Sequence, residues 1–274
     1  MKRKFIELDG GRLSYLDNEV VSSYILFFIH GNSGSSRSWY KQYQDDLFAG
    51  YRLIVFDLPA HGESDAWPNP QDDYSLIALG QTMANAVLAI APTAGSYLLV
   101  GLSLGTNVVA EMLAHKKILP KGVVLVSSCV VGGVYTIDKI FKTDIDMSIF
   151  FTDKPDRNLV DSIFKRIVTN PTDVQNSIAD FYKTNEVFRP ELARSIAQDK
   201  LSDEMALIST YTGSMLIVFG KDESAVNPDY LDGAAIPLWR NQIYKLEGNH
   251  FVNIDSFEEF NKLLIDYCKD MFLQ

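Results

Sequence analysis

GLSLG, residues 101–105, follows the apolar run YLLV at 97–100 and opens a segment of helical pattern that extends to residue 115. A serine on a tight turn from a strand into a helix has a strained backbone, and the residues two positions to either side must be small. The two glycines meet this requirement. We therefore predict that Ser103 is a nucleophile at the end of a strand, the alternative being a glycine-rich turn without chemistry.

Short apolar runs of strand character recur on both sides of this turn. Because they are rich in branched and aromatic residues and show no polar alternation, we expect strands that are covered on both faces. The runs are YILFFI (24–29), RLIVF (52–56), YLLV (97–100), GVVLVS (122–127) and MLIVF (215–219). Helical patterns lie between or after them, at 37–48, 74–91, 103–115 and 254–272. This alternation predicts an α/β fold with a mostly parallel central sheet flanked by helices.

Two regions depart from the alternation. Residues 4–17 read as an antiparallel hairpin about a Gly-Gly turn. Residues 131–205 contain no convincing strand and carry proline-separated helical stretches. These stretches are 155–169, 172–184 and 189–200. We interpret residues 131–205 as a helical cap inserted into a core domain that is formed by residues 1–130 and 206–274.

The composition limits the classes of function. The chain has 274 residues, of which 47% are hydrophobic, and is long enough for a core domain with an insertion. A net charge of −10 disfavours binding to nucleic acid, which needs clustered Lys and Arg. No apolar run approaches the roughly 20 residues that cross a bilayer, and Glu7 and Asp9 interrupt any signal-peptide core. We therefore expect a cytoplasmic protein that acts on a small molecule and binds neither nucleic acid nor membrane.

A nucleophilic serine needs a base within hydrogen-bond reach, and four histidines compete for this role. His250 follows the strand-like run NQIYKL at 241–246, and the carboxyl ends of the strands line the site in such folds. We predict that His250 is the base. His30 and His61 lie in turns where a structural hydrogen bond is the better interpretation. His115 closes a helix, where a cation complements the helix dipole.

An oxyanion requires backbone donors near the serine. The helix that begins there presents free N–H groups with a partial positive charge, and the N–H of Leu104 is the natural first donor. The loop HGNSGS at 30–35 can supply a second donor, and we predict the N–H of Asn32. A phosphate-binding loop is the alternative for this segment, but it lacks the Gly-Lys-Ser/Thr ending.

These motifs together resemble the α/β-hydrolase superfamily, in the branch with a helical cap. The loop at 30–35 is similar to the oxyanion loop of that family, DLPAHGES at 57–64 to its D-x-P-G-H-G-x-S turn, and GLSLG to its nucleophile elbow. The departures are Ala60 and Thr106, each at a position where glycine is common. The resemblance covers the chain except residues 131–205. It implies a Ser-acid-His triad that needs no cofactor or metal.

The resemblance also separates two adjacent carboxylates. The family usually places its acid three residues beyond the glycine that ends the penultimate strand, and counting from Gly220 gives Glu223. The residues that follow then fall in register as far as Tyr230. Glu replaces the commoner Asp, and Asn227 replaces the usual proline. Asp222 is the runner-up acid, because turn geometry decides which side chain reaches the histidine.

The resemblance implies a serine hydrolase that cleaves a carboxylic ester through an acyl-enzyme. His250 would remove the proton of Ser103, Glu223 would orient the imidazole, and the N–H groups of Asn32 and Leu104 would hold the oxyanion. Because the base must be neutral, activity should rise with pH through roughly 6 to 7, the range of an ordinary histidine. A flat profile from about pH 5 to 9 would contradict this expectation.

Several alternatives stay open. The elbow serine argues against dehalogenases and epoxide hydrolases, which use a carboxylate there, but esters, thioesters and lactones remain. The HGNS opening at 30–33, the DLPAHGES turn at 57–64 and the GKDE acid at 220–223 also look similar to those of acyl-homoserine lactonases. A ligand receptor of the same fold is the non-enzyme alternative. Most large apolar residues of the cap should form its core, and a few should face a pocket that favours an apolar acyl chain. These residues are Phe141, Met147, Phe150, Phe151, Phe164, Phe181, Tyr182 and Phe188.

The remaining residues of interest are the cysteines. Cys129 and Cys268 each lie beside apolar residues, which favours buried free thiols over a disulfide. No paired-cysteine or His-Glu-x-x-His spacing offers a metal site, so we expect neither a metal nor a cofactor.

Overall fold

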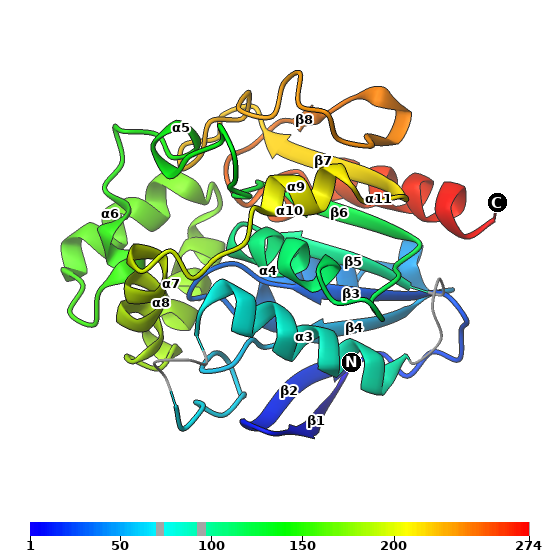
Figure 1. Ribbon diagram of the computed structural model, residues 1–274, viewed down its shortest axis with the longest axis horizontal. Coiled ribbons are helices and arrows are strands. Elements are labelled where there is room, and N and C mark those ends of the chain that lie inside the picture. Colours follow the sequence, from blue (N-terminus) through cyan, green and yellow to red (C-terminus); the bar gives the residue numbers. More distant parts are fainter. Residues whose placement is uncertain (70–73, 92–96, 274) are drawn as a thin grey trace.

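The computed structural model of the chain describes residues 1–69, 74–91 and 97–273 (Figure 1). Over these residues, eight strands form one sheet in the order β1-β2-β4-β3-β5-β6-β7-β8. The strands are β1 (Lys2–Leu8), β2 (Gly11–Asp17), β3 (Ile25–Ile29), β4 (Arg52–Phe56), β5 (Tyr97–Leu102), β6 (Gly122–Val126), β7 (Ser214–Gly220) and β8 (Tyr244–Leu246). Strands β3 to β8 pair in parallel, whereas β2 is antiparallel to both β1 and β4. The predicted α/β fold with a mostly parallel sheet is confirmed.

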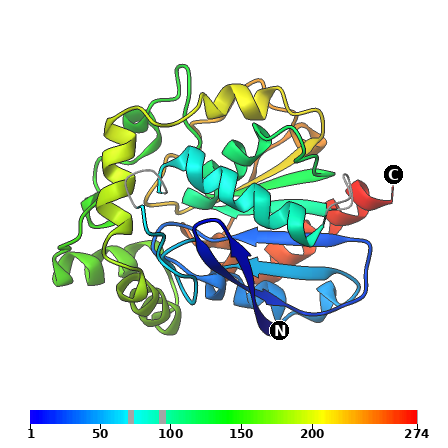
Figure 2. The same cartoon turned by 60° about the horizontal axis from the view of Figure 1, so that its bottom comes forward.

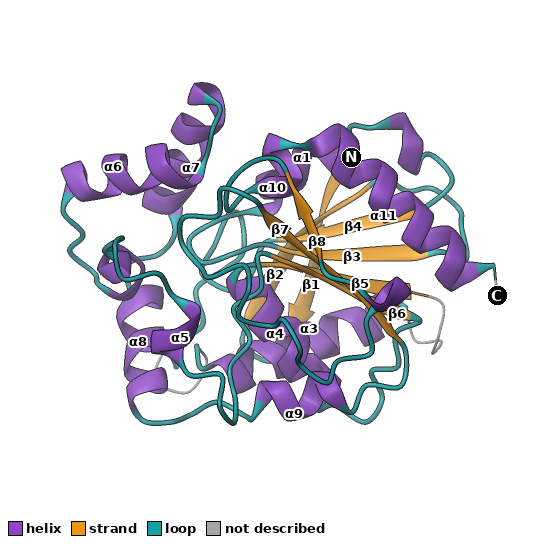
Figure 3. Ribbon diagram, turned by 90° about the horizontal axis from the view of Figure 1, so that it is seen from above, coloured by secondary structure: helices purple, strands orange, loops and turns teal. Residues whose placement is uncertain are grey.

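Helices cover both faces of the sheet. Helices α3, α4 and α9 lie on one face, and α1, α10 and α11 lie on the other (Figure 3). The α-helices are α1 (Tyr40–Tyr43), α3 (Leu76–Ile90), α4 (Leu104–Leu113), α5 (Ile137–Ile140), α6 (Arg157–Ile167), α7 (Pro171–Lys183), α8 (Phe188–Ala197), α9 (Glu204–Ser209), α10 (Val252–Asp255) and α11 (Phe257–Phe272). The 3-10 helices are η1 (Ser36–Trp39), η2 (Asp46–Phe48), η3 (Met147–Phe151) and η4 (Trp239–Asn241). In the described part of the chain, no helix has the length and apolar character needed to cross a membrane.

Strand β3 shows why the apolar runs lack polar alternation. Successive residues of a strand point to opposite faces of the sheet. Phe27 and Ile29 therefore pack with the residues of α3 and α4, whereas Leu26 and Phe28 pack with Trp39 and the residues of α11. All residues of β3 are buried because helices cover both faces. The expected N-terminal hairpin is also present, and Figure 2 shows β1 and β2 at one edge of the sheet.

The helix expected at 37–48 is wrong as a single element. The segment forms the three short helical segments η1, α1 and η2 instead. The side chain of Ser35 accepts a hydrogen bond from the N–H of Arg37, and the side chain of Asp45 accepts one from the N–H of Leu47. Ser35 caps the start of the first segment, whereas Asp45 begins η2 within the expected helix, because a local side-chain acceptor competes with the helical ladder.

The segment between β6 and β7 lies at the carboxyl ends of the parallel strands, where Figure 1 shows α6, α7 and α8 together. Residues 131–205 form helices and loops, and α6 to α8 match the three expected helical stretches. The rings of Phe150, Phe164 and Phe181 meet edge to face in a separate hydrophobic cluster of this segment. Helix α9 spans residue 205 and packs against α4.

Asp17, at the end of β2, is buried between two cations. Its carboxylate lies 2.9 Å from Lys4 Nζ and 2.8 Å from Arg52 Nη2. Burial alone would raise the pKa of Asp17, but hydrogen bonds from Arg52 and Lys4 outweigh it and lower the pKa to about 2. Because this folded pKa is below the unfolded value of about 3.9, the ionised pair stabilises the fold above about pH 4. That contribution is lost as the pH falls towards 2.

We expect Asp17→Asn to lower the free energy of unfolding by about 2–3 kcal/mol at pH 7, because it removes the negative partner of two cations. Urea unfolding of the variant and the wild type, measured from pH 7 down to pH 3, checks this. The difference between them should shrink below about pH 4, where Asp17 begins to bind a proton in the unfolded chain. A difference that stays constant over this range would contradict the ionic origin.

Candidate active site

Ser103 lies at the junction of β5 and α4. Its backbone has φ 52° and ψ −122°, a strained conformation for a residue with a side chain. A Cβ atom on Gly101 would lie 2.4 Å from the carbonyl oxygen of Gly105, and a Cβ atom on Gly105 would lie 2.4 Å from that of Ile29. The tight crossing of strand and helix therefore requires both glycines, as the GLSLG pattern indicates.

We expect Gly101→Ala to lower the free energy of unfolding by about 1–3 kcal/mol and to displace Ser103, because the added methyl group meets backbone atoms that cannot rotate away. Gly50→Ala is the matched control, since no atom of the described residues lies within 4 Å of the position of its Cβ atom. Thermal unfolding and fluorophosphonate labelling of both variants check the prediction. Equal stability of the two variants would contradict the close approach at the turn.

Glu223 and His250 come together from the ends of two neighbouring strands. Glu223 follows β7, His250 follows β8, and both side chains are buried. Nδ1 of His250 lies 3.0 Å from each carboxylate oxygen of Glu223. One of these oxygens also accepts the N–H of Ala225 at 2.8 Å. Asp222 is exposed, so the turn after β7 directs the Glu223 carboxylate towards the imidazole and leaves Asp222 in solvent.

The environment of Glu223 favours its ionised form. Burial alone would raise the pKa of this carboxyl, but the interaction with His250 and the backbone N–H groups of Ala225 and Val226 outweighs burial and lowers it. An ionised carboxylate accepts the Nδ1–H of His250 and so selects the tautomer in which Nε2 is unprotonated. His250 lines the cavity beside Ser103, where this nitrogen can receive a proton.

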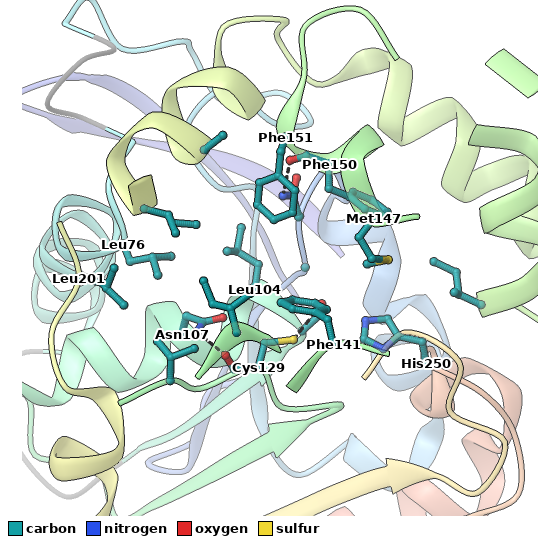
Figure 4. Close-up of a pocket in the computed structure, with 18 of the residues that line it drawn as sticks. Leu76, Leu104, Asn107, Cys129, Phe141, Met147, Phe150, Phe151, Leu201 and His250 are labelled. Carbon is teal, nitrogen blue, oxygen red and sulfur yellow. Dashed lines mark hydrogen bonds between the residues drawn. The ribbon is translucent and has the colours of Figure 1, made fainter. Parts of the chain in front are cut away.

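Ser103 and His250 line the same cavity, of about 310 Å³ (Figure 4). In the described part of the chain, no hydrogen bond joins them, and the partner of Ser103 Oγ is Cys129 Sγ at 3.8 Å. Catalytic hydrogen bonds are often long in free enzymes and shorten with substrate. Burial raises the pKa of Cys129 to about 12, so the thiol keeps its proton. It is a weak hydrogen-bonding neighbour of the serine.

Both expected oxyanion donors lie at this cavity. Asn32 and Leu104 line it, and among residues 1–69, 74–91 and 97–273 no group accepts a hydrogen bond from either N–H. The side-chain nitrogen of Asn32 donates to the carbonyl oxygen of Phe150 at 3.0 Å, which ties the loop to the segment 131–205. Two unpaired N–H groups beside Ser103 can bind the oxygen of a tetrahedral intermediate.

His30 and His61 join the loop that carries Asn32 to the loop that follows β4. Nε2 of His30 accepts the N–H of Leu58 at 3.0 Å, and Nε2 of His61 accepts the N–H of Ser33 at 3.1 Å. Burial lowers the pKa of His30 and lowers that of His61 well below its ordinary value. Both rings therefore stay neutral and can accept these bonds, which agrees with the structural role expected for them.

The walls of the cavity are mainly apolar. Of the large residues expected in the core of the cap, several reach the cavity, so more of them face it than the expected few. These are Phe141, Met147, Phe150, Phe151 and Phe164. Phe181 and Phe188 are buried elsewhere, and Tyr182 is largely exposed. Such a lining suits an apolar part of a ligand.

Two polar wall residues, Cys129 and Asn107, were not anticipated as site residues from the sequence. Cys129 follows β6, and Asn107 lies in α4 one turn beyond Ser103. Both positions carried a usable signal. A residue just after a parallel strand, and a residue four places after an elbow serine, are placed by the topology at the same edge of the sheet.

A family model described as the alpha/beta hydrolase fold matches residues 24–265. The sheet order, the helices on both faces and the strained serine turn are the features of such a fold. The chain therefore belongs to the alpha/beta hydrolase fold family. No curated protein sequence matches the chain at a significant level.

Solved structures with the same fold cover nearly the whole chain. A mutant of the N-acyl homoserine lactonase AidH, complexed with N-hexanoyl homoserine lactone, is 20% identical over 100% of this chain and 99% of its own, with a TM-score of 0.91. An esterase from Rhodococcus sp. ECU1013 is 22% identical over 99% of this chain and 100% of its own, with a TM-score of 0.83. A bromoperoxidase from Bacillus anthracis is 18% identical over 98% and 100%, with a TM-score of 0.78. One fold thus carries several named activities, so function must be argued from the site.

Proposed function

We propose that this protein is a serine hydrolase that cleaves carboxylic esters of small or medium acyl chains. The observation that carries the proposal is the meeting of a serine on a strained turn and a buried His–Glu pair at one apolar cavity. Ser103, His250 and Glu223 would form the triad. The N–H groups of Asn32 and Leu104 would form the oxyanion hole.

Acylation starts when Ser103 Oγ attacks the carbonyl carbon of the ester. As the new C–O bond forms, the serine proton passes to Nε2 of His250, and the carbonyl oxygen becomes an oxyanion held by the two backbone N–H groups. Glu223 stabilises the imidazolium through Nδ1–H. The bond to the leaving alcohol then breaks, the alcohol takes the proton from His250, and the acyl group stays on Ser103 as an ester.

Deacylation repeats these steps with water. Nε2 of His250 takes a proton from water as the water oxygen attacks the acyl carbon, and the same N–H groups hold the second oxyanion. The bond to Ser103 Oγ breaks, and the serine recovers its proton from His250. The acid leaves, and the free enzyme is regenerated without a metal or cofactor in any step.

The cavity supports an apolar acyl group. Its volume of about 310 Å³ and its aromatic walls suit a short to medium hydrocarbon chain. We propose that residues 131–205 act as a cap that supplies these walls, on a core of residues 1–130 and 206–274. Such a cap excludes bulk water from the reacting atoms, which strengthens the interactions at the oxyanion.

A lactone is the second candidate substrate. The lactonase AidH, whose structure contains N-hexanoyl homoserine lactone, has the TM-score of 0.91 over the whole of this chain, including the segment between β6 and β7. A lactone is a cyclic ester, so the same triad would open it by the same two steps. The alcohol would then remain attached to the acid product.

A panel of substrates tests the proposal. p-Nitrophenyl butyrate, a butanoyl thioester and N-hexanoyl homoserine lactone are incubated with the protein, and release of acid is followed by titration at constant pH. Turnover that Ser103→Ala abolishes supports a serine hydrolase, and the preferred member of the panel identifies the bond. Binding of these compounds without turnover would contradict the proposal and favour a ligand receptor of the same fold.

A further inference from the structure

Asn107 is a polar side chain in the wall of the mainly apolar cavity (Figure 4). It lies in α4, four residues after Ser103, and is buried. Ser103 directly precedes α4 and does not share its helical backbone, and Asn107 lies in the first turn of that helix. Both residues line the cavity, so a substrate bound at Ser103 can extend to the side chain of Asn107.

The orientation of the Asn107 amide is determined by its neighbours. Nδ2 donates to the carbonyl oxygen of Cys129 at 2.7 Å and to Oε2 of Glu204 at 2.7 Å. A carbonyl oxygen can only accept, so the nitrogen must face it. Oδ1 then points the other way, and Figure 4 shows this oxygen on the cavity side. Among the residues that the structure describes, none donates a hydrogen bond to it.

Glu204 favours this orientation because it accepts a hydrogen bond from Nδ2 of Asn107, although its own burial is costly. Its carboxyl is fully buried, and Oε2 accepts the N–H of Val131 at 2.9 Å as well as that of Asn107. Oε1 has no partner within the described residues. Burial raises the pKa of Glu204 to about 8. A buried carboxyl with an unpaired oxygen destabilises a fold, and such groups occur most often where they support a site.

We propose that Oδ1 of Asn107 accepts a hydrogen bond from the substrate. The preferred acyl group then carries an N–H or O–H donor a few bonds from the scissile carbonyl, and plain alkyl chains leave the acceptor unpaired. This inference rests on the proposed ester hydrolysis and names a substrate feature for it. An acceptor without a partner in an apolar cavity costs binding free energy. This cost disfavours substrates that lack the donor.

Two pairs of p-nitrophenyl esters measure this preference. In the first pair, the ester of N-butanoylglycine has an N–H group where that of O-butanoylglycolate has an oxygen atom. In the second pair, the ester of 3-hydroxyoctanoate has a hydroxyl group that the ester of octanoate lacks. The ratio of kcat/KM within a pair does not depend on the fraction of folded enzyme. In at least one pair the wild type should favour the donor by about 5–10-fold, the effect of one neutral hydrogen bond. Asn107→Leu should bring that ratio close to one.

Leu201→Ala is the matched control, because Leu201 lines the same wall beside Asn107 but has no polar atom (Figure 4). It should change the rate with chain length and keep the donor ratio. If neither pair shows a preference in the wild type, or if the preference survives Asn107→Leu, the inference is overturned.

A second measurement separates this inference from the proposed function. If no ester is hydrolysed faster than by Ser103→Ala, the proposed function fails. Calorimetric titration of the intact esters into Ser103→Ala, with and without Asn107→Leu, then tests the donor preference by Kd alone. A donor preference in Kd that Asn107→Leu removes supports the acceptor role, and equal Kd values within both pairs overturn it.

Discussion

Ser103→Ala is expected to lower kcat for p-nitrophenyl butyrate by at least about 10⁴-fold, because it removes the hydroxyl that forms the acyl-enzyme in the proposed mechanism. The fold should persist, since within the described residues the hydrogen bond of this hydroxyl is a weak one, with Cys129 Sγ at 3.8 Å. Initial rates, corrected by thermal unfolding for the folded fraction, measure the loss. Mass spectrometry after fluorophosphonate treatment should find the label on Ser103 in the wild type and no label in the variant.

Cys129→Ala is the informative comparison, because its thiol is the nearest competing nucleophile. Burial raises the pKa of Cys129 to about 12, so almost no thiolate exists at neutral pH and the thiol should not attack the substrate. This variant should lose much less activity than Ser103→Ala, roughly tenfold at most by the loss of one weak contact. Activity that survives Ser103→Ala and disappears in Cys129→Ala would overturn the assignment of the nucleophile.

Glu223→Gln is expected to lower kcat by about 10⁴-fold, the size of effect seen when the acid of a triad becomes an amide. The neutral amide cannot stabilise the imidazolium, and its NH₂ group can donate to Nδ1, which selects the wrong tautomer of His250. The remaining amide oxygen can still accept the N–H of Ala225, so the turn should stay folded. Initial rates and thermal unfolding of the purified variant measure both effects.

Asp222→Asn is the matched control for this prediction. Its side chain is exposed and its neighbour Glu223 occupies the position at the imidazole, so kcat should change by less than about twofold. The two substitutions are chemically alike and adjacent in sequence. A larger loss in Asp222→Asn than in Glu223→Gln would show that the acid has been assigned to the wrong residue.

The core of the fold was predictable from the sequence. The five apolar runs form β3 to β7, because residues buried on both faces leave a continuous apolar signal, and the strand-like run at 241–246 contains the partly buried edge strand β8. The sequence did not predict that residues 37–48 form three short helical segments instead of one helix. Asp45 starts a new segment within this stretch through a local hydrogen bond to the N–H of Leu47, and the sequence does not distinguish such a cap from a residue of one longer helix.

The residues of the candidate site were also predictable only in part. The position of Ser103 could be read from GLSLG because the clash that demands glycine involves atoms of the turn and its nearest strand. Glu223 and Asp222 could be ranked only by resemblance, and their catalytic roles stay predictions. Cys129 and Asn107 were missed although the topology places both at the edge of the sheet that carries Ser103. The sequence does not show which partners other elements bring to a side chain.

By itself, the sequence determined the layered α/β architecture and the strained turn at Ser103, since hydrophobic periodicity and steric clashes act over a few neighbouring residues. Only the tertiary structure decided that Glu223 meets His250, that aromatic residues of 131–205 wall the cavity, and that the amide oxygen of Asn107 faces it. Each of these depends on hydrogen bonds and contacts between distant segments. Such contacts form only when the chain packs. A shift of the turn by one residue would bring a different side chain to the same partner.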